Sequence, residues 1–278
     1  MSTKIKICGI TSLEDALAAL DAGADFLGLI FAQSSPRRVE ESVAKEIVAA
    51  ASGRAQIVGV FKDQEIEYVS ELAMSLKLDY VQCHGKETVE YARRLPTRVI
   101  KVIELQGMDE SPQELNVHGV ESAAATSAVN STFNTVANAA ANVAEAPVDV
   151  SAENSAAVTE PSIVLNPPEL SILAAEALAW KDDAAFLLFD RPKLLKDPEW
   201  YKRAINELKT AEPLAMPYFF AGGLTASNVG EVVATLQPFA VDVASSVEAA
   251  PGQKDIGKMK DFCKAVKRDS GGVSACAH

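Results

Sequence analysis

Two side chains in this sequence have the types and placement to take part in catalysis. Cys8 precedes a glycine and an expected helix, so backbone N–H groups beside its thiol would favour a thiolate. Asp190 follows the apolar residues 186–189, where a carboxylate is costly unless it reaches a polar cavity and works there as an acid or base. Cys8 could instead be a small core residue. Asp190 could instead form an ion pair with Arg191 or Lys193.

A second group of residues could bind a phosphate through turns and hydroxyls. Two consecutive apolar runs late in the chain are each followed by such residues, namely Gly222 and Gly223 after the first run and Ser245 and Ser246 after the second. Backbone N–H groups at a turn that opens a helix bind anions. Two neighbouring loops of this chemistry favour a phosphate site more strongly than one glycine pair does.

Three further polar residues complete the candidate ligand-binding set. Arg37 lies on an expected loop, where an arginine is usually solvated but can also bind a carboxylate in bidentate fashion. Gln82 and His84 come at the end of another apolar run, which begins at Tyr80. The pattern leaves open whether His84 contacts a ligand or supports the loop beneath it, and we favour support.

Eight short runs rich in apolar and β-branched residues are typical of buried parallel strands. They are residues 5–8, 26–31, 56–61, 80–82, 99–103, 186–189, 218–220 and 240–243. Apolar residues with helical spacing lie between several of these runs, as between Leu13 and Leu20. Strand and helix therefore alternate along the chain, which predicts an α/β fold with a parallel sheet.

Eight strands in roughly 220 residues, once an insertion is set aside, are typical of a (β/α)8 TIM barrel. A doubly wound sheet also alternates strand and helix, but it rarely needs so many strands, and no Gly-x-Gly-x-x-Gly follows the first run. We therefore expect the closed barrel. The carboxyl ends of its strands meet at one face, which would bring the candidate residues together.

The segment between Val102 and Trp180 carries most of the net charge. The chain has 278 residues and a formal net charge of −12, and this segment holds 11 acidic residues but neither Lys nor Arg. Its centre is rich in Ala, Ser, Thr and Asn without apolar periodicity, so burial would not offset the entropy of ordering it. We expect one barrel domain over 1–278, with a disordered insertion at 108–164 between the fifth and sixth strands and a frayed tail at 269–278. A weak Ala-rich helix inside the insertion is the alternative.

Composition argues against several classes of protein. Outside the acidic segment the charges nearly cancel, which gives no electrostatic case for binding nucleic acid. The sequence has no run of about 18 apolar residues, which is the length that a membrane-spanning helix needs. The first residues lack the core of a signal peptide, so we expect a cytoplasmic protein with reduced thiols.

The four cysteines have no zinc-site spacing. Cys263 is expected to pack on a helix face and Cys83 to face the helices. We expect a monomer or a weak homodimer.

Short motifs follow one another along nearly the whole chain outside the acidic segment. They include Lys-Ile-Cys-Gly-Ile-Thr at 6–11, Val-Gln-Cys-His-Gly at 81–85, Ala-Gly-Gly-Leu-Thr at 221–225 and Val-Asp-Val at 241–243, with Ser-Pro-Arg at 35–37 and Val-Glu at 247–248. In this order the motifs resemble those of the phosphoribosylanthranilate isomerase family of tryptophan biosynthesis. Together they are specific, whereas any one of them alone would not be.

The resemblance implies an isomerase that catalyses the Amadori rearrangement of N-(5-phosphoribosyl)anthranilate to 1-(2-carboxyphenylamino)-1-deoxyribulose 5-phosphate. In the family a cysteine after the first strand is the general base and an aspartate after the sixth strand is the general acid, and Cys8 and Asp190 hold these positions. Arg37 matches the arginine that contacts the anthranilate carboxylate, and the glycine and serine turns match the phosphate cradle. A small phosphorylated substrate is implied, and neither a cofactor nor a metal.

The loop after the sixth strand departs from the family. A stretch like Gly-Gly-Thr-Gly is replaced by residues 191–199, which bring three cations and a proline beside Asp190. Ser246 stands where the family often has a glycine. The alternatives to a working isomerase are therefore a phosphosugar-binding barrel that has lost catalysis and an isomerase of another phosphosugar.

Overall fold

The structure, a computed structural model, describes residues 2–105, 172–211, 214 and 216–270. These residues belong to one compact unit. The expected insertion at 108–164 lies outside them, as do residues 271–278 of the expected tail. Residues 269 and 270 end the last helix, α9 (Ile256–Ser270). The domain boundaries given above therefore stay a prediction.

Eight parallel strands close into a barrel, in which neighbours in sequence are neighbours in space and β8 returns to β1. They are β1 (Lys4–Cys8), β2 (Phe26–Ile30), β3 (Gln56–Phe61), β4 (Tyr80–Cys83), β5 (Arg98–Glu104), β6 (Phe186–Asp190), β7 (Tyr218–Phe220) and β8 (Ala240–Val243). Closure gives each of these strands two hydrogen-bonded neighbours. The prediction of a (β/α)8 TIM barrel is confirmed.

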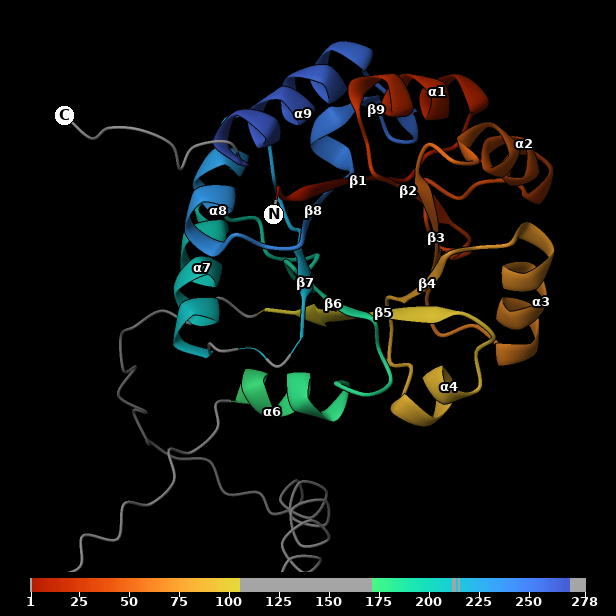
Figure 1. Ribbon diagram of the computed structural model, residues 1–278, viewed down its shortest axis with the longest axis horizontal. Helices are drawn as coiled ribbons and strands as arrows, with labels where there is room; N and C mark the ends of the chain where they lie inside the picture. The colour runs from red at the N-terminus through yellow and green to blue at the C-terminus, as the bar shows by residue number, and fades with distance from the viewer. Residues whose placement is uncertain (1, 106–171, 212–213, 215, 271–278) are drawn as a thin grey trace, which may run out of the picture. The chain divides into compact units, whose positions relative to one another are not determined.

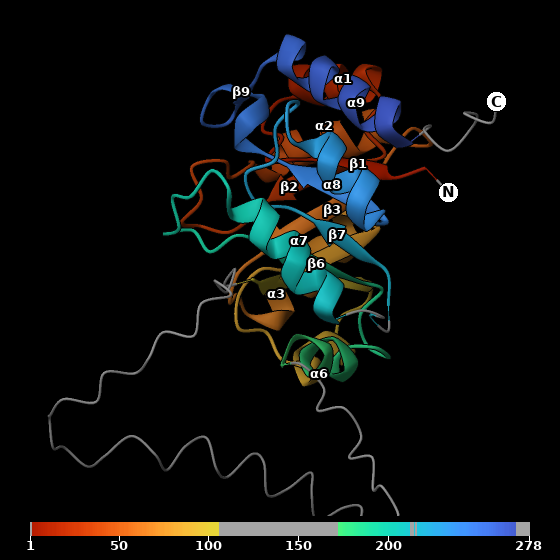
Figure 2. The same ribbon diagram turned by 90° about the vertical axis from the view of Figure 1, so that its left-hand side faces the viewer.

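Helices surround the ring of strands, as Figure 1 shows in a view along the barrel. They are α1 (Leu13–Ala22), α2 (Glu41–Ala51), α3 (Ile66–Leu76), α4 (Val89–Arg93), α6 (Ile172–Ala179), α7 (Trp200–Ala211), α8 (Val229–Leu236) and α9. Local signals set their ends: the Ser12 side chain accepts a hydrogen bond from the N–H of Asp15 to open α1, and Gly23, with φ of 98°, closes it. Helix α9 packs against both α1 and α8, so the last described helix lies beside the first (Figure 2).

The strand ends found in the structure differ from the expected ones by at most one residue. Pairing with neighbours causes the extensions, for example at Asp190, which lies opposite Glu104 in the ladder. The sequence did not predict a short antiparallel hairpin after β8. It consists of β9 (Glu248–Ala250) and β10 (Gln253–Lys254) and follows the turn η1 (Ser245–Val247). Strands of two or three residues are too short to show a period of two in the sequence.

Side chains on alternate strand positions fill the barrel in layers. Aromatic rings occupy the layer at the amino ends of the strands, where the rings of Phe186 and Phe239 stack with centroids 4.5 Å apart and Phe26 meets Phe219 edge-on at 5.2 Å. Polar side chains form the next layer, because Lys6 and Asp242 are register partners on β1 and β8. The carboxyl half of the barrel is therefore polar and the amino half is closed by rings.

The three described cysteines divide between two layers. Cys83 and Cys263 are buried between the strands and the helices, as expected. Cys8 is buried inside the barrel. Alternation along β1 places Cys8 on the same side as Lys6, toward the polar half of the interior.

Candidate active site

One cavity of about 580 Å3 opens at the carboxyl ends of the strands. All nine candidate residues line it: Cys8, Arg37, Gln82, His84, Asp190, Gly222, Gly223, Ser245 and Ser246. They come from six of the eight strand ends or the loops that follow them. Residues scattered over the sequence thus meet as the barrel geometry predicts.

Cys8 is held in a space that a glycine provides. Gly28 is its register partner on β2, and a Cβ atom at that position would lie 2.6 Å from the Cys8 sulfur. Burial raises the pKa of the Cys8 thiol above its usual value, although the Lys6 cation acts in the opposite direction. The expectation that backbone N–H groups favour a thiolate is wrong, because the N–H groups of Gly9 and Ile10 both donate to the carbonyl oxygen of Gly28.

Lys6 is the cation that most strongly lowers the pKa of this thiol, and it is fully buried. Its Nζ donates to Oδ2 of Asp242 at 2.9 Å and to Oε1 of Gln82 at 2.9 Å. A buried ammonium without such partners would cost several kcal/mol, on the order of 3 to 5. The pair with Asp242 raises the pKa of Lys6 against the effect of burial, so the lysine stays charged.

Gln82 connects Lys6 to His84, and this fixes the tautomer of the imidazole. Since Oε1 of Gln82 accepts from Lys6, its Nε2 faces Nδ1 of His84, at 3.1 Å, and donates to it. Burial, together with nearby cations of which Lys193 acts most strongly, lowers the pKa of His84 to about 4. The imidazole is therefore neutral and carries its proton on Nε2. This buried Nε2 has no hydrogen-bond partner among the described residues and lies 3.7 Å from Oδ2 of Asp190.

Asp190 has the environment of an acid. Burial raises the pKa of its carboxyl to about 6, although the N–H of Arg191 donates to Oδ1 at 2.8 Å. The guanidinium of Arg191 turns away and donates to the carbonyl oxygen of Asp197, at 3.3 Å. The described polar contacts of the Asp190 carboxyl group are thus this backbone N–H and the imidazole of His84, and they favour the acid over the ion pair that the sequence left open.

The glycine and serine turns occupy one side of the cavity. Gly222 and Gly223 have φ of 92° and 73°, and a Cβ atom on Gly222 would lie 2.7 Å from the backbone nitrogen of Arg191. Ser246 donates its hydroxyl to the carbonyl oxygen of Leu224, so this hydroxyl is held by the neighbouring loop. The turns therefore present backbone where a side chain would not fit.

The remodelled loop after β6 adds charge at the same side. Arg191 and Lys193 both line the cavity. Nη1 of Arg191 lies 3.2 Å from the position that a Cβ atom on Gly223 would take, so the guanidinium covers the glycine turn. The sequence shows the three cations of this loop, but the way the loop folds back decides which of their side chains reach the cavity.

Arg37 reaches the cavity over Gly9. A Cβ atom on Gly9 would lie 2.8 Å from Cδ of Arg37, so the glycine gives the arginine its path. The guanidinium donates to both carboxylate oxygens of Glu248, at 2.7 Å each. Sequence reasoning did not connect these two residues. It also gave no role to Lys6 and Asp242, which the register of β1 and β8 places side by side.

Neither a metal site nor a membrane span is found in the part of the chain that the structure describes. Its His, Cys, Asp and Glu side chains form no group of three suited to a metal ion. None of its helices has the length and hydropathy needed to cross a bilayer. The expected absence of a cofactor stays a prediction.

The fold and the cavity define a class, the (β/α)8-barrel enzymes that place an acid, a thiol and glycine turns at the carboxyl ends of their strands. The family model described as N-(5'phosphoribosyl)anthranilate (PRA) isomerase matches residues 5–130 and 169–265. The chain belongs to this family. The resemblance predicted from the motifs is confirmed.

Similar proteins agree with this assignment. The N-(5'-phosphoribosyl)anthranilate isomerase of Geobacter metallireducens is 31% identical over 268 residues, which cover 95% of this chain and 98% of the relative. A crystal structure of phosphoribosyl anthranilate isomerase from Thermus thermophilus has a TM-score of 0.61 at 27% identity, over 95% of this chain and 98% of that one. Another, in complex with reduced 1-(o-carboxyphenylamino)-1-deoxyribulose 5-phosphate, has a TM-score of 0.60 over 96% and 99% and, at 24% identity, supports the fold alone.

Proposed function

We propose that this chain is the isomerase of tryptophan biosynthesis that converts N-(5-phosphoribosyl)anthranilate to 1-(2-carboxyphenylamino)-1-deoxyribulose 5-phosphate. The observation that carries the proposal is that a carboxyl with a pKa of about 6 and a buried thiol line the same cavity, from strands β6 and β1. Membership of the family supports the substrate. The cytoplasmic location and the state of monomer or weak homodimer stay predictions.

Asp190 acts first, as the general acid. Its protonated carboxyl gives a proton to the furanose ring oxygen, the bond between this oxygen and C1 breaks, and the nitrogen lone pair forms the Schiff base. A carboxyl with a pKa of about 6 is still protonated in a useful fraction of molecules near neutral pH. The neutral His84, with its Nε2 toward Asp190, adds no competing charge at the acid.

Cys8 acts second, as the general base. In the fraction of molecules whose thiol is ionised, the thiolate removes the proton from C2. The electrons of that C–H bond form the C1=C2 bond of an enaminol, and the π electrons of the C1=N bond return to the nitrogen. The enaminol then takes a proton at C1 and loses the proton of its C2 hydroxyl, which leaves the ketone. Lys6 supports this step because its ammonium is the counter-charge that acts most strongly on the thiolate in this buried site.

The two anionic ends of the substrate meet two cationic sides of the cavity. Backbone N–H groups at Gly222, Gly223, Ser245 and Ser246 would hold the phosphate, with the guanidinium of Arg191 above them. Arg37 would bind the anthranilate carboxylate on another side of the cavity. Fixing both ends places C1 and C2 of the sugar between acid and base.

The remodelled loop does not favour the alternative of a barrel without catalysis. Asp190 keeps its place in the cavity and the pKa of an acid although Arg191 and Pro192 follow it. The loop supplies cations to the cavity instead of glycines. We therefore favour the working isomerase.

Growth of a tryptophan auxotroph that lacks this isomerase tests the proposal. The wild-type chain is expected to restore growth without tryptophan, and neither Cys8→Ala nor Asp190→Ala is expected to do so. Western blots control for the amount of each protein. A soluble wild-type protein that restores no growth would refute the proposed function and support the binding module.

Replacing Arg191 by Met is expected to raise KM about tenfold and to change kcat less than threefold. The guanidinium of Arg191 would bind the phosphate equally in the ground state and the transition state. Its loss therefore weakens substrate binding more than it slows the chemical step. Steady-state kinetics at two salt concentrations measures the effect. Lys196→Met is the matched control, because Lys196 is exposed on the same loop and does not line the cavity. Equal effects of the two variants would contradict a specific role for Arg191.

Replacing Gly28 by Ala is expected to destabilise the protein by about 1 to 3 kcal/mol and to lower kcat at least tenfold. The added methyl group would lie 2.6 Å from the Cys8 sulfur and 2.9 Å from its Cα, so the base must move. Denaturant unfolding and turnover measure the two effects. Gly257→Ala is the control, because its nearest neighbour is Oδ1 of Asp255 at 3.2 Å. A fully active, stable Gly28→Ala variant would show that Cys8 can shift without loss.

A further inference from the structure

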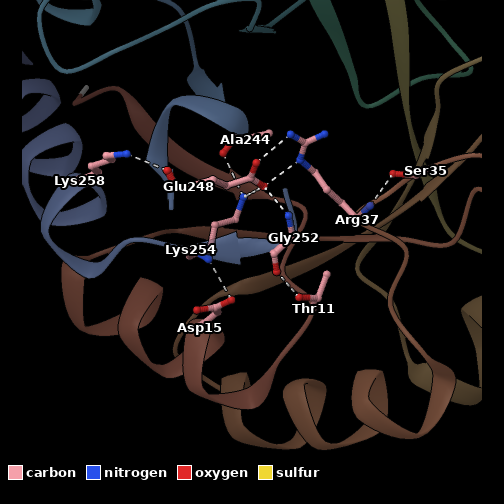
Figure 3. Close-up of polar contacts among 9 residues, drawn as sticks. All are labelled: Thr11, Asp15, Ser35, Arg37, Ala244, Glu248, Gly252, Lys254 and Lys258. Carbon is pink, nitrogen blue, oxygen red and sulfur yellow. Dashed lines mark hydrogen bonds and ion pairs between the residues drawn. The ribbon is translucent and has the colours of Figure 1, made fainter. Parts of the chain in front are cut away.

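Glu248 lies at the centre of a cluster of hydrogen bonds (Figure 3). Its Oε1 accepts from Nε of Arg37 at 2.7 Å and from Nζ of Lys254 at 2.9 Å, and its Oε2 accepts from Nη2 of Arg37 at 2.7 Å. The side chain of Glu248 is 4% exposed and that of Lys254 is fully buried. Glu248 itself does not line the cavity, whereas Arg37 does.

The pair uses only one edge of the guanidinium. Arginine carries five N–H donors, on Nε, Nη1 and Nη2, and a carboxylate can bind along either of two edges. Glu248 takes the edge formed by Nε and Nη2. The contacts within the described residues leave the edge of Nη1 without a protein acceptor. This second edge has the geometry for another carboxylate.

Further hydrogen bonds hold Glu248 and its partner Lys254 in place. Lys254 also donates to the carbonyl oxygen of Ala244, at 3.0 Å, and Lys258 donates to the carbonyl oxygen of Glu248, at 2.8 Å. The hairpin is tied to α1 as well, because Asp15 accepts from the N–H of Lys254 at 3.2 Å and Thr11 donates to the carbonyl oxygen of Gly252 (Figure 3). The guanidinium of Arg37 is therefore attached to the body of the barrel, although Arg37 stands on a loop.

The charges of the cluster leave a positive excess. Burial would raise the pKa of Glu248, but hydrogen bonds from Arg37 and Lys254 outweigh it and hold the pKa below the usual range, so the carboxylate is ionised at neutral pH. One negative charge then faces two positive ones, those of Arg37 and Lys254. A second carboxylate on Arg37 would balance this charge rather than compete with Glu248.

We propose that Glu248 is a positioning residue that fixes the guanidinium of Arg37, so that the outer edge of this guanidinium receives the carboxylate of the substrate. The inference rests on the proposed function, because that function supplies the anthranilate carboxylate. Glu248 does not touch the substrate and acts through Arg37. It would thereby contribute to the choice of a carboxylated substrate over one without this group.

Two ligands that differ only in the carboxylate test this inference. They are reduced 1-(o-carboxyphenylamino)-1-deoxyribulose 5-phosphate and the same compound without its carboxyl group, and calorimetry gives the Kd of each with the full chain. The wild type is expected to bind the carboxylated ligand at least tenfold more tightly than the other. Glu248→Gln is expected to lose at least tenfold in affinity for the carboxylated ligand and less than threefold for the other.

Three further proteins complete the experiment. Arg37→Lys is expected to show the same selective loss, and adding Glu248→Gln to it is expected to cause less than a threefold further change. Asp183→Asn is the matched control, because Asp183 forms the same bidentate pair with Arg93, at 2.8 and 2.9 Å, away from the cavity. In turnover, Glu248→Gln is expected to raise KM about tenfold with kcat changed less than threefold.

Several results would overturn the inference. Equal losses for both ligands in Glu248→Gln would mean that Glu248 only holds the hairpin, and tighter binding of the carboxylated ligand would mean that it competes for Arg37. If Glu248→Gln does not fold, Glu248→Asp takes its place. The losses of affinity in Glu248→Asp and in Arg37→Lys would then contradict the inference if they add up in the double variant, because Glu248 would not act through Arg37. A wild type that turns over its substrate but does not distinguish the ligands would refute the inference and leave the isomerase intact. A wild type that binds neither ligand would refute both.

Discussion

Replacing Asp190 by Asn is expected to lower kcat about 1,000-fold, because the amide cannot give a proton to the ring oxygen. Binding of the reduced product analogue is expected to change less than threefold, since the amide keeps the size of the carboxyl group. Stopped assays of conversion and calorimetry measure the two quantities. Glu176→Gln is the control, because burial also raises the pKa of Glu176 and this residue does not line the cavity of Asp190.

The same substitution is expected to change how stability depends on pH. A carboxyl whose pKa is raised in the folded state holds its proton more tightly there, so its contribution to stability is present in acid and is lost as the pH rises toward the folded value. For Asp190 this loss falls between its ordinary pKa near 4 and the folded value of about 6. The side chain is 24% exposed, so we expect the wild type to lose only about 2 kcal/mol relative to Asp190→Asn over that range.

Unfolding by urea at pH 4, 5, 6 and 7 measures this difference. A constant difference in the free energy of unfolding between the wild type and Asp190→Asn would show that the carboxyl has no raised pKa. A kcat within tenfold of the wild type would show that another group gives the proton. Either result would contradict the role of Asp190 as the general acid.

Replacing Cys8 by Ala is expected to lower kcat by about 100- to 10,000-fold, because no other group in the cavity is placed on β1 to remove the proton from C2. Cys8→Ser is expected to lose almost as much, since a hydroxyl is a far weaker acid than a thiol and gives little alkoxide even beside Lys6. The Kd of the reduced product analogue is expected to stay within threefold in both variants, as for the loss of an interaction made in the transition state.

Cys83→Ala provides the matched control for a buried thiol. Cys83 is fully buried and burial raises the pKa of its thiol to about 12, but it faces the helices. We expect Cys83→Ala to keep kcat within threefold of the wild type and to lose some stability. Equal losses of kcat in Cys8→Ala and Cys83→Ala would mean that the loss comes from packing and not from a base.

The fold was predictable because each strand is buried on both faces and therefore reads as an apolar run. The runs at 26–31 and 186–189 need no knowledge of their partners to be recognised. The convergence of Cys8, Gln82 and Asp190 then follows from the topology alone, because all carboxyl ends of a parallel barrel lie on one face. The hairpin from Glu248 to Lys254 has strands too short to leave such a pattern.

The electrostatics of the site could not be predicted in the same way. The sign of the pKa change at Cys8 depends on whether the N–H groups of Gly9 and Ile10 are free, and both donate to Gly28 across the β1–β2 pair. The contacts of Asp190 depend on where the side chain of Arg191 points, which the loop to Asp197 decides. Interactions between residues distant in sequence thus determine the pKa values and contacts of Cys8 and Asp190, whereas local sequence patterns determine the strands and helices of the barrel.

The central claim is that an acid and a base in one cavity turn the C2 alcohol of the substrate into a ketone. Carbon-13 NMR tests it directly, with N-(5-phosphoribosyl)anthranilate labelled at C2 of the ribose and the purified full-length chain. The account predicts that the signal of the alcohol carbon is replaced by that of a ketone carbon with the wild type, and persists with Cys8→Ala or Asp190→Asn. A wild-type protein that binds the reduced product analogue yet leaves the labelled carbon an alcohol would contradict the account.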